Sequence, residues 1–420
     1  VVFGLYAQED IKNAAGEVVV EKDALIELGT TDEEGKLVFQ ADLPHGKYYI
    51  QEVEHKPGYL PNDEVYSFDA SYTDQTLELL AFSEEISNQP TITEFTKVDL
   101  TGGQEIEGAK MQILDQDGKV VEEWVSKKEP HVVYALEPGE YVLHEEQAPT
   151  EQGYVRAEDV KFVVEETGDV QKVKMEDDHT KVSISKTDIT DGKEIEGAKL
   201  QILNQDGEVV ESWTTGEEHL IEYLPIGTYT LHEEAAVDGY IVANDVEFTV
   251  EETGEIQKVK MEDERAMGQL VIVKTDTDSK TALEGVEFVL LEKETGEEVG
   301  RLKTGKDGKA VSELLPIGTY ENGVFKEPIT YVLKETATLK GYEKTEEEWE
   351  IVFTYQNDKT PVIEVVKEIQ NKKIPETPGT VKPGPKTGDD TNWFLPLLAL
   401  GVSAGMVAGL LYYRKRHKKA

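Results

Sequence analysis

The sequence predicts an all-β protein: tandem antiparallel β-sandwich domains, followed by one C-terminal transmembrane helix. Short runs rich in β-branched and aromatic residues recur along the chain, among them 270–273 and 162–164. Asp-Gly pairs such as Asp117-Gly118 separate these runs, which is typical of β-hairpins. An uncharged apolar run extends from Trp393 to Tyr413. As a helix, a run of this length can cross a hydrocarbon core of ~30 Å.

An internal repeat of about 89 residues divides the chain into domains. Residues 104–118 return as 193–207, and residues 160–177 return as 246–263, with fainter copies on both sides. The first copy lacks an opening strand, which we expect to lie before Val1. The parts that we expect are domains at 1–90, 91–179, 180–264 and 265–375, a Pro/Gly linker at 376–390, the transmembrane helix at 391–413 and a basic tail at 414–420.

The composition excludes several classes of function. The chain has 43 Lys and Arg against 86 Asp and Glu, a net charge of −43, which disfavours binding to nucleic acid. It has no cysteine and therefore no disulfide. Asp115-x-Asp117-Gly118 could suggest a calcium loop, but the later ligands are missing and a turn is the better interpretation. No zinc spacing, phosphate loop or nucleophile motif occurs, so we expect no metal, no cofactor and no enzymatic turnover.

Three positions that can carry chemistry recur in register. A lysine closes the first strand of a domain, a glutamate ends the strand after a turn that contains glycine, and an Asp or Asn lies in the last strand. Asp178 competes with Asp177, but alignment of the two Lys-Met-Glu-Asp copies selects Asp177 and Asp263. The first domain has only Glu52 and Asn88. The complete sets are Lys97, Glu145 and Asp177; Lys186, Glu233 and Asp263; and Lys274, Glu335 and Asn371.

These patterns resemble the SpaA-type, collagen-adhesin B-type (CnaB-like) family of prealbumin-like, Ig-like sandwich domains. The resemblance rests on the Lys-x-Asp opening, a Gly-Ala-x-hydrophobic strand, and the motif Tyr-x-Leu-x-Glu-x-x-Ala-Pro-x-Gly-Tyr. The second domain has two extra residues before Gly153 and two copies lack the proline, departures that affect a loop. In this family the lysine and the Asp or Asn join spontaneously as an isopeptide bond, with the glutamate assisting. The resemblance implies the same role for the three sets. The last motif ends at Tyr59, Tyr154, Tyr240 and Tyr342.

The chemistry of such a bond requires buried, uncharged partners. The lysine must lose its proton to attack, although its reference pKa is about 10.4, and burial disfavours the charged form. An Asp target must be protonated, because a carboxylate repels a nucleophile, and the glutamate must move protons. First and last strands that are neighbours would hold the pair together. A lone strand lysine is more often an edge charge that prevents aggregation; three complete sets in register favour the crosslink.

The C-terminal segment resembles the cell-wall sorting signal of Gram-positive surface proteins. A short motif precedes the apolar run, and the basic tail that follows marks the cytoplasmic side. The family motif is Leu-Pro-x-Thr-Gly, and Gly384 replaces its leucine. The resemblance implies that a sortase cuts between Thr387 and Gly388 and joins Thr387 to peptidoglycan. A plain single-span anchor is the alternative. The motif residues are Gly384, Pro385, Lys386, Thr387 and Gly388.

Together these features predict a sortase-anchored stalk or adhesin on the surface of a Gram-positive bacterium. We expect it to span the membrane once before cleavage, and then to be extracellular and bound to the cell wall. Its expected partners are the sortase and peptidoglycan, and by family analogy a host extracellular-matrix protein, which an N-terminal head would bind. One alternative is a base or tip pilin subunit, although the Tyr-Pro-Lys motif of many pilins does not occur here. The other is the anchor region of a secreted enzyme.

Overall fold

The computed structural model describes residues 1–71 and 80–375. These residues confirm the all-β prediction: they hold strands and a single short 3₁₀ helix, η1 (Thr150–Gln152). Residues Val1–Lys372 form one compact unit. The predicted sorting motif, transmembrane helix and basic tail lie outside the described residues. Within the described residues, no helix is long and apolar enough to cross a membrane.

The first domain has one four-stranded antiparallel sheet, in the order β4-β1-β5-β6, and a small hairpin, β2-β3. Its core contains Leu5, Ile11 and Tyr48, all buried. Val2–Ala7 pairs with the strand that carries Glu52. The strands are β1 (Val2–Ala7), β2 (Ile11–Lys12), β3 (Val18–Val20), β4 (Leu25–Thr30), β5 (Lys47–Glu54) and β6 (Val65–Asp69).

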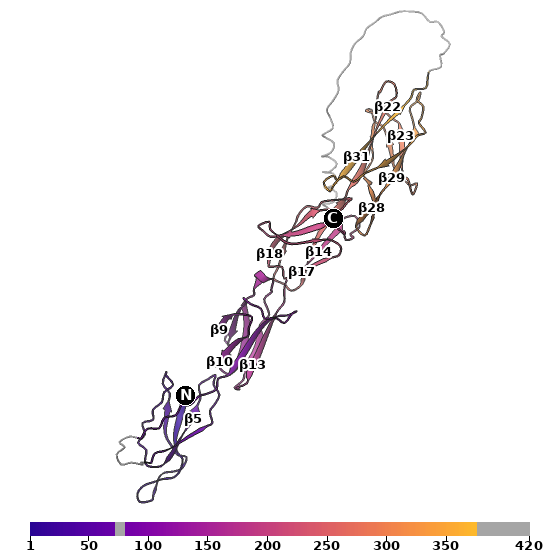
Figure 1. Cartoon of the computed structure of the whole chain (residues 1–420). Coiled ribbons are helices and arrows are strands. Elements are labelled where there is room, and N and C mark those ends of the chain that lie inside the picture. The colour runs from indigo at the N-terminus through magenta and orange to yellow at the C-terminus, as the bar shows by residue number, and fades with distance from the viewer. Residues whose placement is uncertain (72–79, 376–420) are drawn as a thin grey trace, which may run out of the picture. The chain divides into compact units, whose positions relative to one another are not determined.

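The second domain is a sandwich of two sheets, with orders β10-β7-β13 and β12-β11-β8-β9. Figure 1 labels its strands β9, β10 and β13. Alternate residues of its strands point inward, as the period of two predicts: Met111 and Ile113 of β8 are buried, whereas Gln112 between them is only partly buried. The strands are β7 (Ile92–Asp99), β8 (Lys110–Leu114), β9 (Val120–Val125), β10 (His131–Tyr134), β11 (Gly139–Gln147), β12 (Val160–Val164) and β13 (Val170–Asp177).

The third domain repeats this plan. Its sheets have the orders β17-β14-β21-β19 and β16-β15-β18-β20. Its core includes Val182, Leu200 and Leu231. The strands are β14 (Lys181–Asp188), β15 (Lys199–Leu203), β16 (Val209–Thr214), β17 (His219–Glu222), β18 (Gly227–Ala235), β19 (Tyr240–Ile241), β20 (Val246–Val250) and β21 (Ile256–Arg265).

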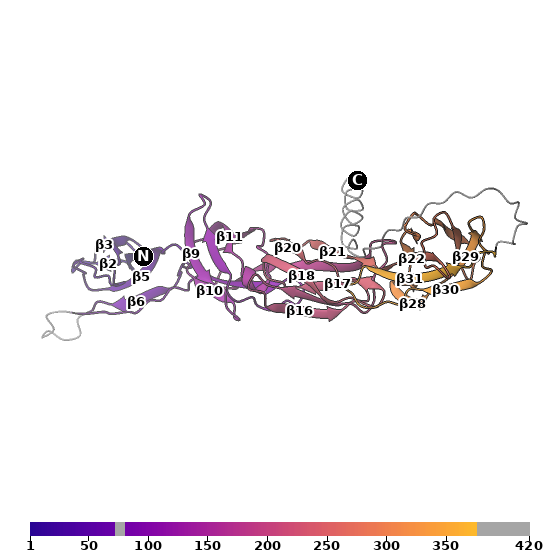
Figure 2. The same ribbon diagram turned by 90° about the horizontal axis from the view of Figure 1, so that it is seen from above.

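The fourth domain keeps the two sheets and adds a hairpin, β27-β28. In one sheet β25, β26 and β31 all pair with β22; the other has the order β24-β23-β29-β30. Strands β22 and β31 lie side by side in both views (Figures 1 and 2). The strands are β22 (Met267–Asp276), β23 (Glu287–Glu292), β24 (Glu298–Lys303), β25 (Lys309–Val311), β26 (Leu315–Pro316), β27 (Gly318–Glu321), β28 (Val324–Pro328), β29 (Thr330–Ala337), β30 (Glu348–Val352) and β31 (Val362–Asn371).

The prediction of a purely antiparallel sandwich was wrong in one respect. In the second, third and fourth domains the first and last strands are neighbours, as expected, but they run parallel: β7 with β13, β14 with β21, and β22 with β31. Parallel strands need a long crossover, and here the crossover is the rest of the domain, which passes through the second sheet before returning. Alternation of apolar and polar residues reveals a strand but not its direction. The sequence pattern therefore could not distinguish the two arrangements.

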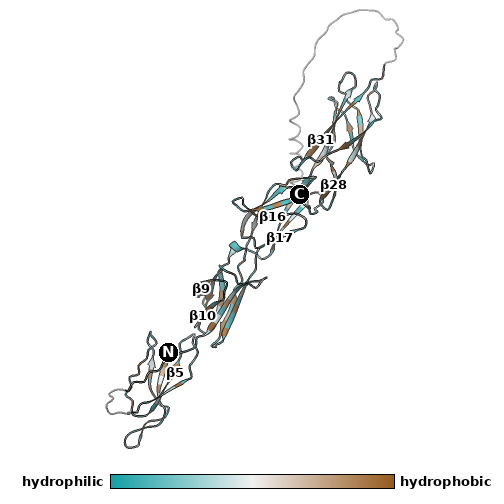
Figure 3. Cartoon of the chain, viewed as in Figure 1, coloured by the Kyte–Doolittle hydropathy of each residue, from teal (hydrophilic) through white to brown (hydrophobic). Residues whose placement is uncertain are grey.

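Each domain has a core of its own between its layers. Figure 3 shows apolar residues mainly along the strands and hydrophilic residues mainly in the connections. The buried side chains fall into separate clusters, one within each domain, with a further small cluster at Ile195, Ala198 and Tyr240. Because apolar residues fill these layers, any charged group on an inward-facing strand position is removed from water.

Candidate isopeptide sites

Strand register places Lys97 and Asp177 in contact. Lys97 of β7 pairs with Met175 of β13, and Asp177 is two residues further along. Residues two apart on a strand share a face, so the Asp177 side chain emerges on the same face as Lys97. Glu145 comes from β11 of the opposite sheet. The two sheets therefore present the amine and the two carboxyl groups to one another across the domain core.

The second-domain set is a closed, buried cluster. Lys97 Nζ donates to Asp177 Oδ1 and lies 2.9 Å from Glu145 Oε2. Lys97 is 4% exposed, and Glu145 and Asp177 are fully buried. Glu145 Oε2 also accepts the backbone N–H of Ala157 at 2.8 Å, which fixes the carboxyl group relative to the strand. Asp178, the competing residue, instead accepts a hydrogen bond of 2.6 Å from Lys181.

The third-domain set repeats this geometry. Lys186 Nζ donates to Asp263 Oδ1 and lies 2.9 Å from Glu233 Oε2. Glu233 Oε2 accepts the backbone N–H of Ala243 at 2.6 Å, the counterpart of the Ala157 contact. The lysine is 1% exposed and the aspartate is fully buried.

In the fourth domain an amide replaces the second carboxyl group. Lys274 Nζ lies 2.8 Å from Glu335 Oε2 and donates to Asn371 Oδ1 at 2.5 Å. Asn371 Nδ2 donates to Glu335 Oε1 and to Thr338 Oγ1, both at 2.7 Å. These bonds hold the Asn371 carbonyl toward the lysine. Burial lowers the pKa of Lys274, which favours the neutral amine that a nucleophilic attack needs.

Protonation distinguishes the aspartate sets from the asparagine set. Among the described residues, Glu145 Oε1 and Asp177 Oδ2 are buried without a hydrogen-bond partner, and so are Glu233 Oε1 and Asp263 Oδ2. Two ionised carboxyl groups cannot hydrogen-bond to each other, but a shared proton satisfies both. In the fourth domain the Asn371 amide supplies that hydrogen instead.

The pKa shifts agree with a shared proton. Burial raises the pKa of Asp177 to about 7; Lys97 opposes this, and the Glu145 carboxyl raises it again. Burial likewise raises the pKa of Asp263 to about 7, with opposing and reinforcing effects from Lys186 and Glu233. Both aspartates therefore hold a proton in the range where an ordinary aspartate is ionised.

In the part of the chain that the structure describes, the two predicted residues of the first domain have no lysine beside them. Asn88 Nδ2 donates to Glu52 Oε2 at 2.7 Å, the same bond that Asn371 makes with Glu335. Glu52 Oε1 accepts the backbone N–H of Asn62 at 2.9 Å. Within residues 1–71 and 80–90, the glutamate and the amide are therefore prepared as in the fourth domain.

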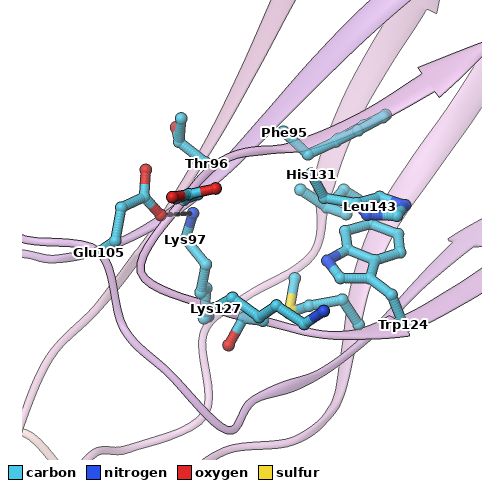
Figure 4. Close-up of a pocket in the computed structure, with 11 residues that line it drawn as sticks. Phe95, Thr96, Lys97, Glu105, Trp124, Lys127, His131 and Leu143 are labelled. Carbon is cyan, nitrogen blue, oxygen red and sulfur yellow. Dashed lines mark hydrogen bonds between the residues drawn. The ribbon is translucent and has the colours of Figure 1, made fainter.

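A small hollow of about 10 Å³ lies beside Lys97. Such a volume is close to the space one water molecule needs. Figure 4 shows Lys97 and Glu105 on one side of it and Trp124 and His131 on the other, with a hydrogen bond from the backbone N–H of Lys97 to Glu105 at 3.1 Å. The Glu105 carboxyl group thus fixes the position of the backbone at Lys97. Repeat comparison had not singled out Glu105, Ala157, Ala243 or Thr338. Ala157 and Ala243 lie outside the repeated segments, whereas Glu105 recurs as Glu194, which accepts the backbone N–H of Lys186 at 3.1 Å.

The sequence profile of a family described as "SpaA: Prealbumin-like fold domain" matches residues 1–82, 91–179, 180–265 and 268–369. These matches cover most of the chain. The chain belongs to this family. The resemblance that the Lys-x-Asp and Gly-Tyr motifs indicated is thereby confirmed, and the four domains are SpaA-type domains. No curated protein matches the chain.

Solved structures resemble the SpaA-type chain at low identity. The TIE protein of Bacillus anthracis is 23% identical, with a TM-score of 0.48, and the match covers 89% of this chain and 69% of that one. BcpA, the major pilin subunit of Bacillus cereus, is 16% identical, with a TM-score of 0.39 and coverages of 68% and 99%. The major pilin SpaD of Corynebacterium diphtheriae is 16% identical, with a TM-score of 0.32 and coverages of 68% and 98%.

Proposed function

We propose that this chain is a sortase-anchored surface stalk or adhesin of a Gram-positive bacterium, whose domains are locked by spontaneous Lys–Asp and Lys–Asn isopeptide bonds. One observation carries the proposal. In three successive domains a buried lysine, a buried glutamate and an Asp or Asn meet at the pair of first and last strands. Burying a charged cluster is costly, and charge loss by bond formation removes that cost permanently.

The bond-forming step in the aspartate domains releases water. The shared proton resides on Asp177, and Lys97 gives one proton to Glu145, which leaves a neutral amine beside two protonated carboxyl groups. Nζ attacks Cγ of Asp177, Glu145 gives its proton to the departing hydroxyl group, which leaves as water, and Glu145 takes up the second amine proton. A C–N bond replaces a C–O bond, and Glu145 ends protonated, as it was when the attack began. Glu145 lies 2.9 Å from Nζ and contacts Asp177, so it reaches both the group that loses a proton and the group that gains one.

The fourth domain would release ammonia by the same path. Lys274 attacks Cγ of Asn371, and Glu335 moves the amine proton to the leaving amide nitrogen. Glu335 contacts Lys274 through Oε2 and the Asn371 nitrogen through Oε1, so each of its oxygens faces one partner of this transfer. The reaction occurs once per domain, which is why we propose no enzymatic turnover.

Intact mass tests this proposal directly. Residues 1–375, made in a cytoplasm without sortase, should weigh about 53 Da less than their sequence, since two waters of about 18 Da and one ammonia of about 17 Da are lost. Lys97→Met should reduce the deficit by about one third. Lys172→Met should leave the mass deficit unchanged, because Lys172 is an exposed residue of β13, the strand that pairs with β7. A wild-type mass equal to that of the sequence would contradict the crosslinks.

The pH dependence of bond formation should differ between domains. Asp177 and Asp263 have raised pKa values of about 7, so their protonated forms are lost as pH rises through that value. Before the bond forms, the raised pKa of Asp177 also contributes to the stability of the fold. This contribution is complete below the ordinary aspartate pKa of 3.8 and is lost as the pH rises to about 7. We therefore expect bond formation in the second and third domains to slow above pH 7. Peptide mass mapping after refolding at pH 5 to 9 measures each bond separately.

The fourth domain supplies the matched control, because an amide does not titrate in this range. Its bond should not show the decline that protonation of an aspartate imposes. Asn371→Asp should introduce that decline and change the lost molecule from ammonia to water. Equal pH profiles for all three bonds, with and without Asn371→Asp, would contradict the assigned role of the aspartate proton.

The same domains suit a pilin subunit, so anchoring needs its own test. Incubated with a sortase and a cell-wall peptide acceptor, the full chain should be cut after Thr387 and linked to the acceptor as a single copy. A ladder of covalent multimers would favour the pilin alternative. Thr387→Ala should abolish either product if the sorting motif is used.

A further inference from the structure

The junctions between consecutive domains share one hydrogen bond. Gly58, Gly153 and Gly239 each precede a tyrosine in the Gly-Tyr motif. Each carbonyl accepts the backbone N–H of the residue that opens the next domain. The donors and distances are Thr91 at 2.9 Å, Thr180 at 2.8 Å and Ala266 at 2.8 Å. The Gly-Tyr motif of one domain is therefore in contact with the beginning of the next at all three junctions.

Each junction glycine lies against a second segment of the following domain. A Cβ on Gly58 would lie 2.2 Å from the Ala135 carbonyl oxygen, and a Cβ on Gly153 would lie 2.4 Å from the Tyr223 carbonyl carbon. A Cβ on Gly239 would lie 2.7 Å from the Phe325 ring. The three glycines also have positive φ, as do Ala135 and Tyr223. Close approach and backbone conformation thus both require glycine here.

Two threonines connect these segments. Thr91 and Thr180 are fully buried. The Thr180 carbonyl accepts the N–H of Tyr223 at 3.0 Å, and its Oγ1 donates to the Leu224 carbonyl at 2.6 Å. Thr91 makes the same two bonds, with Ala135 at 2.9 Å and Leu136 at 2.6 Å. One residue therefore joins the glycine of the preceding domain to the turn of its own domain.

At the second junction, side-chain hydrogen bonds also connect the following domain to β7, the strand that carries Lys97. The Tyr223 hydroxyl donates to Asp99 Oδ2 at 2.8 Å, and Tyr154 of the preceding domain also hydrogen-bonds to Asp99. Asp99 lies two residues after Lys97 on β7. Burial and the bond to Asp99 raise the pKa of Tyr223 to about 12. At the third junction Arg265 lies 4.1 Å from the Tyr320 ring centroid and donates to Asp188 at 2.5 Å.

We propose that the Gly-Tyr motif is a docking site for the following domain, so that consecutive domains bind through a specific interface. The partner it fits is the start of the next SpaA-type domain and one further segment of it: a backbone donor and a close contact that requires a bare glycine. That contact is a carbonyl group at the first two junctions and the Phe325 ring at the third. Domains joined by a plain linker are expected to reorient freely. The repeated hydrogen bond and the glycine contact, with a buried threonine at the first two junctions, instead hold each pair in one orientation.

Spin-label distances test this interface, and the absence of native cysteine allows unambiguous labelling. Cysteines at the exposed positions Lys119 and Glu208 of residues 1–375 should give a narrow distance distribution. Gly153→Ala and Tyr223→Phe should broaden it at least about twofold, because domains without a fixed interface reorient. Gly341→Ala is the matched control: Gly341 also precedes a tyrosine at positive φ, but no heavy atom lies within 4 Å of its added Cβ, so the distribution should not change.

The result that overturns the docking site is a broad wild-type distribution, or equal widths in the wild type, Gly153→Ala and Tyr223→Phe. If Gly153→Ala prevents folding, Tyr223→Phe decides the matter, since it removes a single hydroxyl group. Intact mass of the same samples reports the isopeptide bonds independently. Failure of the interface and failure of the crosslinks therefore give different results.

Discussion

Stretched between its two ends, the chain should not release the residues that lie between each lysine and its partner. The proposed crosslink would join the first strand of a domain to its last, so tension would pass through covalent bonds rather than through backbone hydrogen bonds. Lys97→Met should free the segment between positions 97 and 177, which are 80 residues apart in the sequence. At about 3.5 Å per residue, this should add one step of roughly 280 Å to the stretched length. Single-molecule force extension measures that step.

The first domain serves as an internal control for this experiment. No lysine lies beside Glu52 and Asn88 in its described residues, so it should extend in the wild type and in every variant. Lys172→Met should add no step, since that lysine is exposed and pairs with Glu94. If the second domain extends in the wild type as it does in Lys97→Met, no covalent bond carries the load.

The second large effect is expected from Glu145→Gln, which keeps the shape of the side chain but cannot accept a proton. The second domain should then keep its fold and lose its bond, so its share of the mass deficit, about 18 Da, should disappear. Closing a loop of about 80 residues stabilises a fold by about 4–5 kcal/mol in the chain-entropy account. At about 4–8 °C per kcal/mol for a domain of this size, the melting temperature should fall by roughly 16–40 °C.

Glu146→Gln is the matched control for this variant. Glu146 is the next residue on β11, is exposed, and lies 3.8 Å from Lys110. Surface ion pairs contribute about 0–1 kcal/mol, so Glu146→Gln should leave both the mass and the melting temperature nearly unchanged. A Glu145→Gln protein that still shows the full deficit would mean that the proton moves without this carboxyl group. Calorimetry and mass measured on the same sample separate lost stability from lost chemistry.

Sequence repeats predicted much of the fold and the composition of the three clusters. Repetition placed Lys97, Glu145 and Asp177 in register with their counterparts, and the alternation of buried positions predicted strands. The parallel direction of β7 and β13 was not predictable, because a period of two is the same in either direction. The partners of the Gly-Tyr motif were not predictable either. Gly153 meets Tyr223 seventy residues later, and no local pattern reports a contact at that separation.

The parallel pairing of β7 and β13 has a consequence for damage and variation. Both strands run toward the same end of the domain, and Lys97 and Asp177 lie near that end in each. Once they are joined, the main chain between them becomes a side branch, and a protease that cuts it leaves the two ends of the protein connected. Insertions in the segment between the two joined residues leave the covalent path between the ends of the protein unchanged. The added hairpin of the fourth domain (β27 and β28) lies in such a branch, where sequence can change without weakening the chain.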